Sequence, residues 1–147
     1  RDTDRSRGLG DVYKRQELSM SRFQERLSDY KSAVDRLEEA LKEPESEIVI
    51  DGVLHRFEFT FELAWETIKD ALEYLGLVDK TGSPRENIQL GFRHGIIEDG
   101  EKWIEIMLSR NLLSHLYDEK ASRDIYNKIK SEYIIEFKKL RDRLEEI

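Results

Sequence analysis

The sequence predicts an all-α protein: an antiparallel, up-and-down four-helix bundle with one additional short helix. Apolar residues recur at helical spacing over long stretches, and capping residues and glycines mark the expected helix ends. Charged residues make up 39% of the chain, as is typical of amphipathic helices with one exposed face. With 147 residues the chain is long enough for one buried core, which indicates a single domain.

The first long helix is expected from Arg22 onward for about 20 residues. Its apolar positions follow a 4-3-4-3-4 spacing and form one stripe: Phe23, Leu27, Tyr30, Val34, Leu37 and Leu41. Pro44 prevents the helix from continuing, because proline lacks the N–H that an interior helical position donates.

Residues 1–19 show neither helical nor strand periodicity and are rich in Arg, Asp and Gly. This leader resembles translated cloning sequence fused to a gene whose natural start is Met20. We therefore expect residues 1–19 to be a non-native or disordered leader, and residues 20–147 to form the helical domain.

The second helix is expected over residues 51–75 and is ended by Gly76. Phe57, Phe59 and Phe61 alternate as in a strand, but the apolar pattern is far too long for an ordinary strand. Phe57, Phe61 and Trp65 could stack on bases, yet aromatic residues at four-residue spacing are more often core residues. We favour the core interpretation.

Three further helix starts carry clear signals. Ser83 can cap a short helix that has Pro84 at its first position and ends near Gly95. Asp99 can cap a fourth helix, and Asp118 a fifth. The apolar residues expected to form the buried face of the fifth helix are Ala121, Ile125, Ile129, Tyr133, Phe137, Leu140 and Leu144.

Composition excludes several classes of protein. The chain has no cysteine, which excludes disulfides, thiolate zinc sites and cysteine nucleophiles and is compatible with a cytoplasmic location. The longest run without a formal charge is seven residues, so no membrane span is expected. A net charge of −7 argues against a general nucleic-acid binder, and in particular against a DNA partner.

Several weaker site candidates have simpler explanations. Glu58, Glu62 and Glu66 share a helix face near His55, which raises the question of a metal site. No histidine has the Glu-x-x-His spacing of a di-metal bundle. We therefore favour a solvated acidic face and expect no metal or cofactor. Arg93 and His94 are most simply a polar helix end. Phosphate-loop and G-x-S-x-G motifs are absent from the sequence.

The densest group of chemically capable residues runs from Ser109 to Glu119. Arg110 offers a permanently charged fork for a phosphodiester, and the imidazole of His115 can donate or accept a proton. Tyr117 presents a hydroxyl. Asn111 directly follows Arg110, and the residues that could support the site are Ser114 and Asp118.

Helical geometry complicates a one-chain site, because Arg110 and His115 lie about 140° apart on an ideal helix. Arg110 must reach around the helix, the helix must end between them, or two subunits must combine their motifs. Judged from these residues alone, an Arg and a His at a helix end are more often structural than catalytic. Cations that could assist nearby are Arg93, Lys102 and Arg123.

Arg110-x4-His115-x-Tyr117 resembles the R-x4-H-x-Y signature of HepT-type toxins of the HEPN superfamily. The resemblance extends over about residues 23–144 and includes the blocks around Phe57 and Ser83. Over these residues the chain is similar to the HepT-like branch whose members are named nucleotidyltransferase substrate-binding proteins. The resemblance implies a HEPN-like bundle that forms a homodimer, with two motifs facing each other across a cleft.

The same resemblance implies a function. It indicates a metal-independent endoribonuclease toxin of a type VII-like toxin–antitoxin pair, in which Arg110, Asn111 and His115 act on RNA. The implied partner is an MNT-type nucleotidyltransferase that neutralises the toxin by transferring AMP to Tyr117. Two alternatives stay open: a non-catalytic nucleotide- or substrate-binding subunit of a two-component nucleotidyltransferase, and a purely structural interaction bundle.

Overall fold

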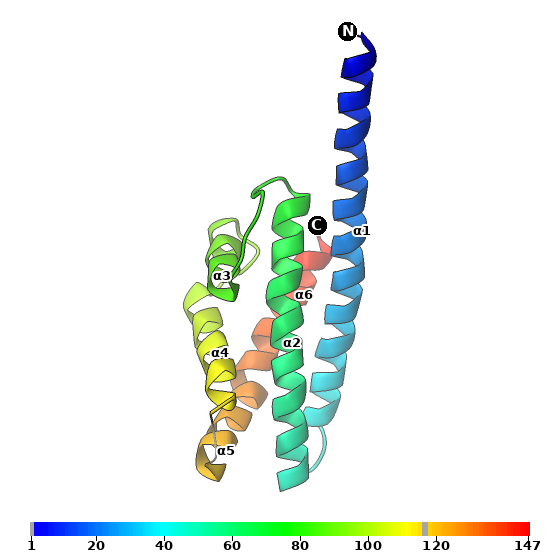
Figure 1. Cartoon of the computed structure of the whole chain (residues 1–147). Coiled ribbons are helices and arrows are strands. Elements are labelled where there is room, and N and C mark those ends of the chain that lie inside the picture. The colour runs from blue at the N-terminus through cyan, green and yellow to red at the C-terminus, as the bar shows by residue number, and fades with distance from the viewer. Residues whose placement is uncertain (1, 116–117) are drawn as a thin grey trace.

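The computed structural model describes residues 2–115 and 118–147, and for residues 2–7 and 9 it describes the backbone alone. All its regular elements are helical, as the sequence predicts: α1 (Asp2–Leu41), α2 (Glu47–Tyr74), α3 (Pro84–Arg93), α4 (Gly100–Leu113), α5 (Glu119–Lys128), a π-helical turn η1 (Ile129–Tyr133) and α6 (Ile134–Glu145). In Figure 1 α2 occupies the middle of the bundle, between α1 on one side and α3 and α4 on the other.

The first helix is about twice as long as expected. α1 begins at Asp2 and runs without a break into the predicted stripe. Its N-terminal half projects beyond the bundle (Figure 1), and Val12, Tyr13 and Leu18 are exposed. Exposed side chains need no apolar stripe, and among the residues whose side chains are described the first buried hydrophobic one is Phe23. The non-native origin of residues 1–19 stays a prediction.

The predicted caps and stops are present. The side chains of Ser83, Asp99 and Asp118 accept backbone N–H groups at the starts of α3, α4 and α5. Gly76 and Gly95 follow α2 and α3 with φ of 71° and 76°, a conformation in which glycine has no steric penalty. The start of α2 lies earlier than predicted, because Ser46 caps it by accepting from the N–H of Val49 at 3.1 Å.

The core is built around aromatic rings from several helices. Phe57 of α2 lies with its ring centre 5.8 Å from that of Tyr133 and 5.9 Å from that of Phe137, and Trp103 of α4 meets Phe137 edge-on at 5.4 Å. Phe57 and Phe61 are fully buried, which confirms the core interpretation for these two residues, whereas Trp65 is half-buried at the edge of the core. Stacking on bases is therefore excluded for Phe57 and Phe61.

The π-helical turn η1 explains an irregularity of the fifth predicted stripe. Ile125, Ile129, Tyr133 and Phe137 are four residues apart, and on a regular α-helix each step would rotate the stripe by about 40°. A π turn holds an additional residue, so it keeps these side chains on the buried face. α5, η1 and α6 thus form one continuous helical element.

Candidate active site at the junction of α4 and α5

The predicted motif lies where α4 ends and α5 begins. α4 ends at Leu113, and beyond it the N–H of His115 bonds to the carbonyl of Leu112 at 2.9 Å. The helix therefore ends between Arg110 and His115, which is one of the three arrangements that the spacing allows. Tyr117, the predicted modification site, lies outside the described residues.

The two predicted supporting residues stabilise the backbone of the junction. The Ser114 hydroxyl donates to the carbonyl of Asn111 at 2.8 Å, which closes the last turn of α4. The Asp118 carboxylate accepts from the N–H of Lys120 at 3.1 Å and caps α5. Asn111, Ser114, His115 and Asp118 are all exposed, so the junction presents its polar groups to solvent.

Arg110 extends from the last turn of α4 toward α2. Its Nη2 forms an ion pair with Oε1 of Glu62 at 2.9 Å, and its side chain is 32% exposed. Its Nε is buried and has no hydrogen-bond acceptor in the part of the chain that the structure describes. One edge of the guanidinium is therefore engaged by protein.

Glu62 is the site residue that the sequence analysis missed. Glu58, Glu62 and Glu66 were expected to form a solvated acidic face; all three are partly exposed, and Glu62 and Glu66 also pair with arginines of other helices. The pairing was not predicted, because helical spacing places side chains on one face without showing which neighbouring helix lies beside that face. One local signal existed: Trp65, three residues after Glu62, donates its indole N–H to Oε2 of Glu62 at 3.0 Å.

A buried hydroxyl network lies behind Arg110. The Tyr133 hydroxyl, on the π-helical turn, is 2.8 Å from the hydroxyl of Ser109 and donates to Oε2 of Glu105 at 2.8 Å. Burial raises the pKa of Tyr133 well above its ordinary value, so its hydroxyl stays protonated, and the bond from Tyr133 lowers the pKa of Glu105. The network ties the residue before Arg110 to the opposite helix. π-helical turns often occur at functional sites.

The three cations proposed as helpers are not gathered around Arg110. Lys102 is held by Glu132 at 2.9 Å and by Glu105 at 3.6 Å. Arg123 lines a cavity of about 320 Å³ whose other charged residues are acidic: Glu47, Asp51, Asp118 and Glu119. Arg93 is exposed in the last turn of α3.

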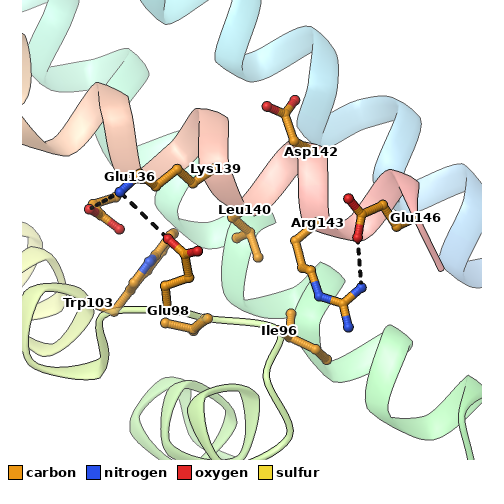
Figure 2. A pocket seen from close by; sticks show the side chains of 10 residues that line it. Ile96, Glu98, Trp103, Glu136, Lys139, Leu140, Asp142, Arg143 and Glu146 are labelled. Atoms are coloured by element: carbon orange, nitrogen blue, oxygen red, sulfur yellow. Dashed lines mark hydrogen bonds and ion pairs between the residues drawn. The ribbon is translucent and has the colours of Figure 1, made fainter.

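A second cavity, of about 240 Å³, lies between the segment after α3 and the helix α6 (Figure 2). The Lys139 ammonium lies 3.6 Å from a carboxylate oxygen of Glu98 and 3.9 Å from one of Glu136. These charged groups of the cavity therefore pair with one another. Burial raises the pKa of Glu136. None of residues 110–115 or Asp118 lines this cavity, so it is separate from the described part of the motif.

Two further structural findings concern only the described residues. Within residues 2–115 and 118–147, no three His, Asp or Glu side chains are grouped as metal ligands would be. In the same ranges, no helix combines the length and the apolar character that crossing a membrane requires.

Comparison with known proteins identifies similar chains. A family model described as nucleotidyltransferase substrate binding protein like matches residues 25–146. A Haemophilus influenzae protein named as a probable ribonuclease HepT is 29% identical over 99 residues, which cover 65% of this chain and 67% of that protein.

Two solved structures have the same fold, each with a TM-score of 0.72 and 25% identity. One, from Thermus thermophilus, covers 78% of this chain and 98% of its own. The other, from Haemophilus influenzae, covers 81% and 98%, and is described as revealing the fold of a substrate binding domain of a nucleotidyltransferase. The family match begins at residue 25, so the projecting part of α1 lies outside it.

Proposed function

Because the chain belongs to the family of nucleotidyltransferase substrate-binding-like proteins, we propose that it is the HepT-like member of a toxin–antitoxin pair and cleaves RNA without a divalent metal. The observation that carries the proposal is the junction of α4 and α5. There the partly exposed Arg110 lies in the last turn of α4, and the exposed His115 follows two residues after the helix ends at Leu113.

The residues at this junction supply what RNA cleavage by transesterification needs. His115 removes the proton of the ribose 2′-hydroxyl, whose oxygen then attacks the adjacent phosphorus. The bond from phosphorus to the 5′-oxygen breaks, and that oxygen receives a proton from a histidine. Arg110 stabilises the charge that develops on the phosphate, and Asn111 binds or orients it. The products are a 2′,3′-cyclic phosphate and a 5′-hydroxyl.

The proposed active form is a homodimer. Leu108 and Leu112 are one turn apart on the outer face of α4 and are 48% and 54% exposed, while Ile104, one turn earlier, packs partly against the core. An apolar stripe on the helix that carries the motif favours a second copy at this face, because burying it removes apolar surface from water. Two motifs would then share one cleft, and two histidines could divide the roles of base and acid.

The partner proposed for this chain is a small nucleotidyltransferase. Transfer of AMP to the Tyr117 hydroxyl would place a phosphodiester charge and a bulky nucleoside two residues from His115, which would repel an RNA phosphate. Incubation with that enzyme and ATP should add one AMP to the wild-type chain and none to Tyr117→Phe.

The test of the ribonuclease activity uses purified protein, a mixed-sequence RNA and EDTA. Wild-type protein should cleave the RNA and leave 2′,3′-cyclic phosphate ends, and His115→Ala should lower the rate at least about 100-fold. His94→Ala is the matched control, because His94 is also an exposed histidine at a helix end. Light scattering on the same samples gives the mass of the active species.

An alternative function is a non-catalytic substrate-binding subunit of a nucleotidyltransferase. It is favoured by the description of the Haemophilus influenzae structure and by the net charge of −7, which weakens nonspecific attraction of RNA. Intact RNA after prolonged incubation with a folded dimer, together with stable binding to the nucleotidyltransferase, would favour this alternative over the ribonuclease.

A further inference from the structure

The carboxylate of Glu62 lies between two donors from different helices. Oε1 accepts from Nη2 of Arg110 on α4 at 2.9 Å, and Oε2 accepts from the indole N–H of Trp65 on α2 at 3.0 Å. Each carboxylate oxygen therefore has its own donor. The Trp65 bond disfavours rotation of the carboxylate away from Arg110, because rotation would break it.

The base of this arrangement is rigid. Phe61 and Leu63, the residues on either side of Glu62, are both buried in the core, so α2 cannot turn about its axis without exposing them. The guanidinium is planar, so holding Nη2 limits the directions in which the rest of the group can point. Nε is also buried, so the ion pair on Nη2 and the burial of Nε together restrict the Arg110 side chain.

A purely stabilising role explains this ion pair poorly. The side chains of Arg110 and Glu62 are 32% and 37% exposed, and ion pairs this exposed contribute little to folding stability. The packing of α2 and α4 is supplied by buried apolar residues of both helices, such as Phe57 and Trp103. The pair has a larger effect on where the guanidinium points than on whether the protein folds.

We propose that Glu62, held in place by Trp65, is the positioning residue for Arg110 and directs the accessible edge of its guanidinium toward an RNA phosphate. The inference rests on the proposed ribonuclease function. Glu62 does not touch the substrate and acts through Arg110. Misplacing a charge-stabilising group by about 1 Å is enough to lower a rate by about 100-fold, so loss of Glu62 should affect the chemical step.

The first test compares steady-state RNA cleavage by four variants. Glu62→Ala should lower kcat about 10- to 100-fold while KM changes less than about 3-fold. Glu62→Gln keeps one acceptor for Arg110 and should restore part of kcat. Trp65→Phe keeps the ring but removes the donor to Glu62, and should lower kcat several-fold. Glu58→Gln is the control, since Glu58 is half-buried one turn earlier and has no side-chain bond in the described ranges.

The proposal is overturned if Glu62→Ala retains wild-type kcat, or if Glu62→Ala is faster than wild type, since the pair would then restrain Arg110. Folding of each variant is checked by circular dichroism. If Glu62→Ala does not fold, Glu62→Gln and Trp65→Phe carry the test, and wild-type kcat in both of them overturns the proposal.

A second test needs no activity and separates this inference from the ribonuclease proposal. In ¹⁵N NMR, the Arg110 Nη groups should rotate slowly and give separate signals in wild type and Glu58→Gln. In Glu62→Ala they should rotate freely and give one averaged signal. Loss of the signals in Arg110→Ala identifies them. Averaged Arg110 signals in wild type would refute the positioning role. Restricted signals in a protein that leaves RNA intact would refute the ribonuclease function alone.

Discussion

Two arginines, Arg26 of α1 and Arg110 of α4, are both held by carboxylates of α2, but in different ways. Arg26 donates from Nε to Asp70 at 3.2 Å and from Nη1 to Glu66, so two of its edges are engaged. Arg110 has one carboxylate partner among the described residues, Glu62, on Nη2. Their side chains are almost equally exposed, at 34% and 32%, so exposure alone does not distinguish them.

The difference lies in the number of acceptors and in the burial of the carboxylates. The Asp70 side chain is 5% exposed, and that of Glu62 is 37% exposed. A buried carboxylate needs its cation, because an unpaired buried charge is costly. Arg26 is therefore a structural residue that joins α1 to α2, whereas Arg110 has fewer bonds to protein among the described residues, which fits its proposed role at an RNA phosphate.

The largest expected difference is in folding stability. Arg26→Ala leaves the buried carboxylate of Asp70 without its cation and should lower the free energy of unfolding by about 2–3 kcal/mol. Arg110→Ala should lower it by less than about 1 kcal/mol, because its partner is accessible to water. Urea unfolding followed by circular dichroism measures both values. Equal losses for the two variants would remove the distinction between a structural and a functional arginine.

A smaller effect is expected at the hydroxyl network behind Arg110. Tyr133→Phe removes bonds to Ser109 and Glu105 and should cost about 1–2 kcal/mol of unfolding free energy. Tyr126→Phe is the matched control, because Tyr126 is equally buried and its hydroxyl has no partner among the described residues. If thermal unfolding shows the same loss for both variants, the network does not support the end of α4.

The smallest effect concerns a buried carboxylate without an arginine. Glu136 lies 3.9 Å from Lys139, and burial raises its pKa. The folded state therefore disfavours its charged form: the penalty is absent below the ordinary glutamate pKa and complete above the raised pKa. Glu136→Gln should raise the melting temperature by a few degrees at about pH 7.

This gain should disappear as the pH falls through the raised pKa of Glu136. Differential scanning calorimetry between about pH 4 and pH 8 measures it, with Glu98→Gln as the exposed control on the same lysine. A stabilisation independent of pH would mean that the charge of Glu136 is not its cause. Burial also raises the pKa of Asp70. Asp70 differs from Glu136 because Arg26 offsets part of the cost of burying its charge.

Local chemistry made most of the fold predictable. The helix ends at Gly76 and Gly95 follow from the positive φ that glycine adopts freely, and the starts at Ser83, Asp99 and Asp118 follow from side chains that accept free N–H groups. These signals lie within a few residues of the feature that they cause. The motif from Arg110 to His115 was predictable for the same reason.

Other features were not predictable from local patterns. α1 continues through residues without an apolar stripe, and the π turn at Ile129–Tyr133 depends on packing against Phe57 of another helix. The proposed positioning residue Glu62 is separated from Arg110 by 47 intervening residues (110 − 62 − 1). Sequence spacing cannot report such a contact, because it depends on how two helices are placed relative to each other.

Most helix ends and the polar segment from Arg110 to Asp118 could thus be read from the sequence, because propensity, capping and periodicity act within a few residues. Which charges meet depends on how the helices pack. Glu62, Glu66 and Asp70 are four residues apart on one helix, and they serve two arginines on two different helices. The packing of α1 and α4 against α2 assigns each carboxylate its partner, and with it a structural or a proposed catalytic context.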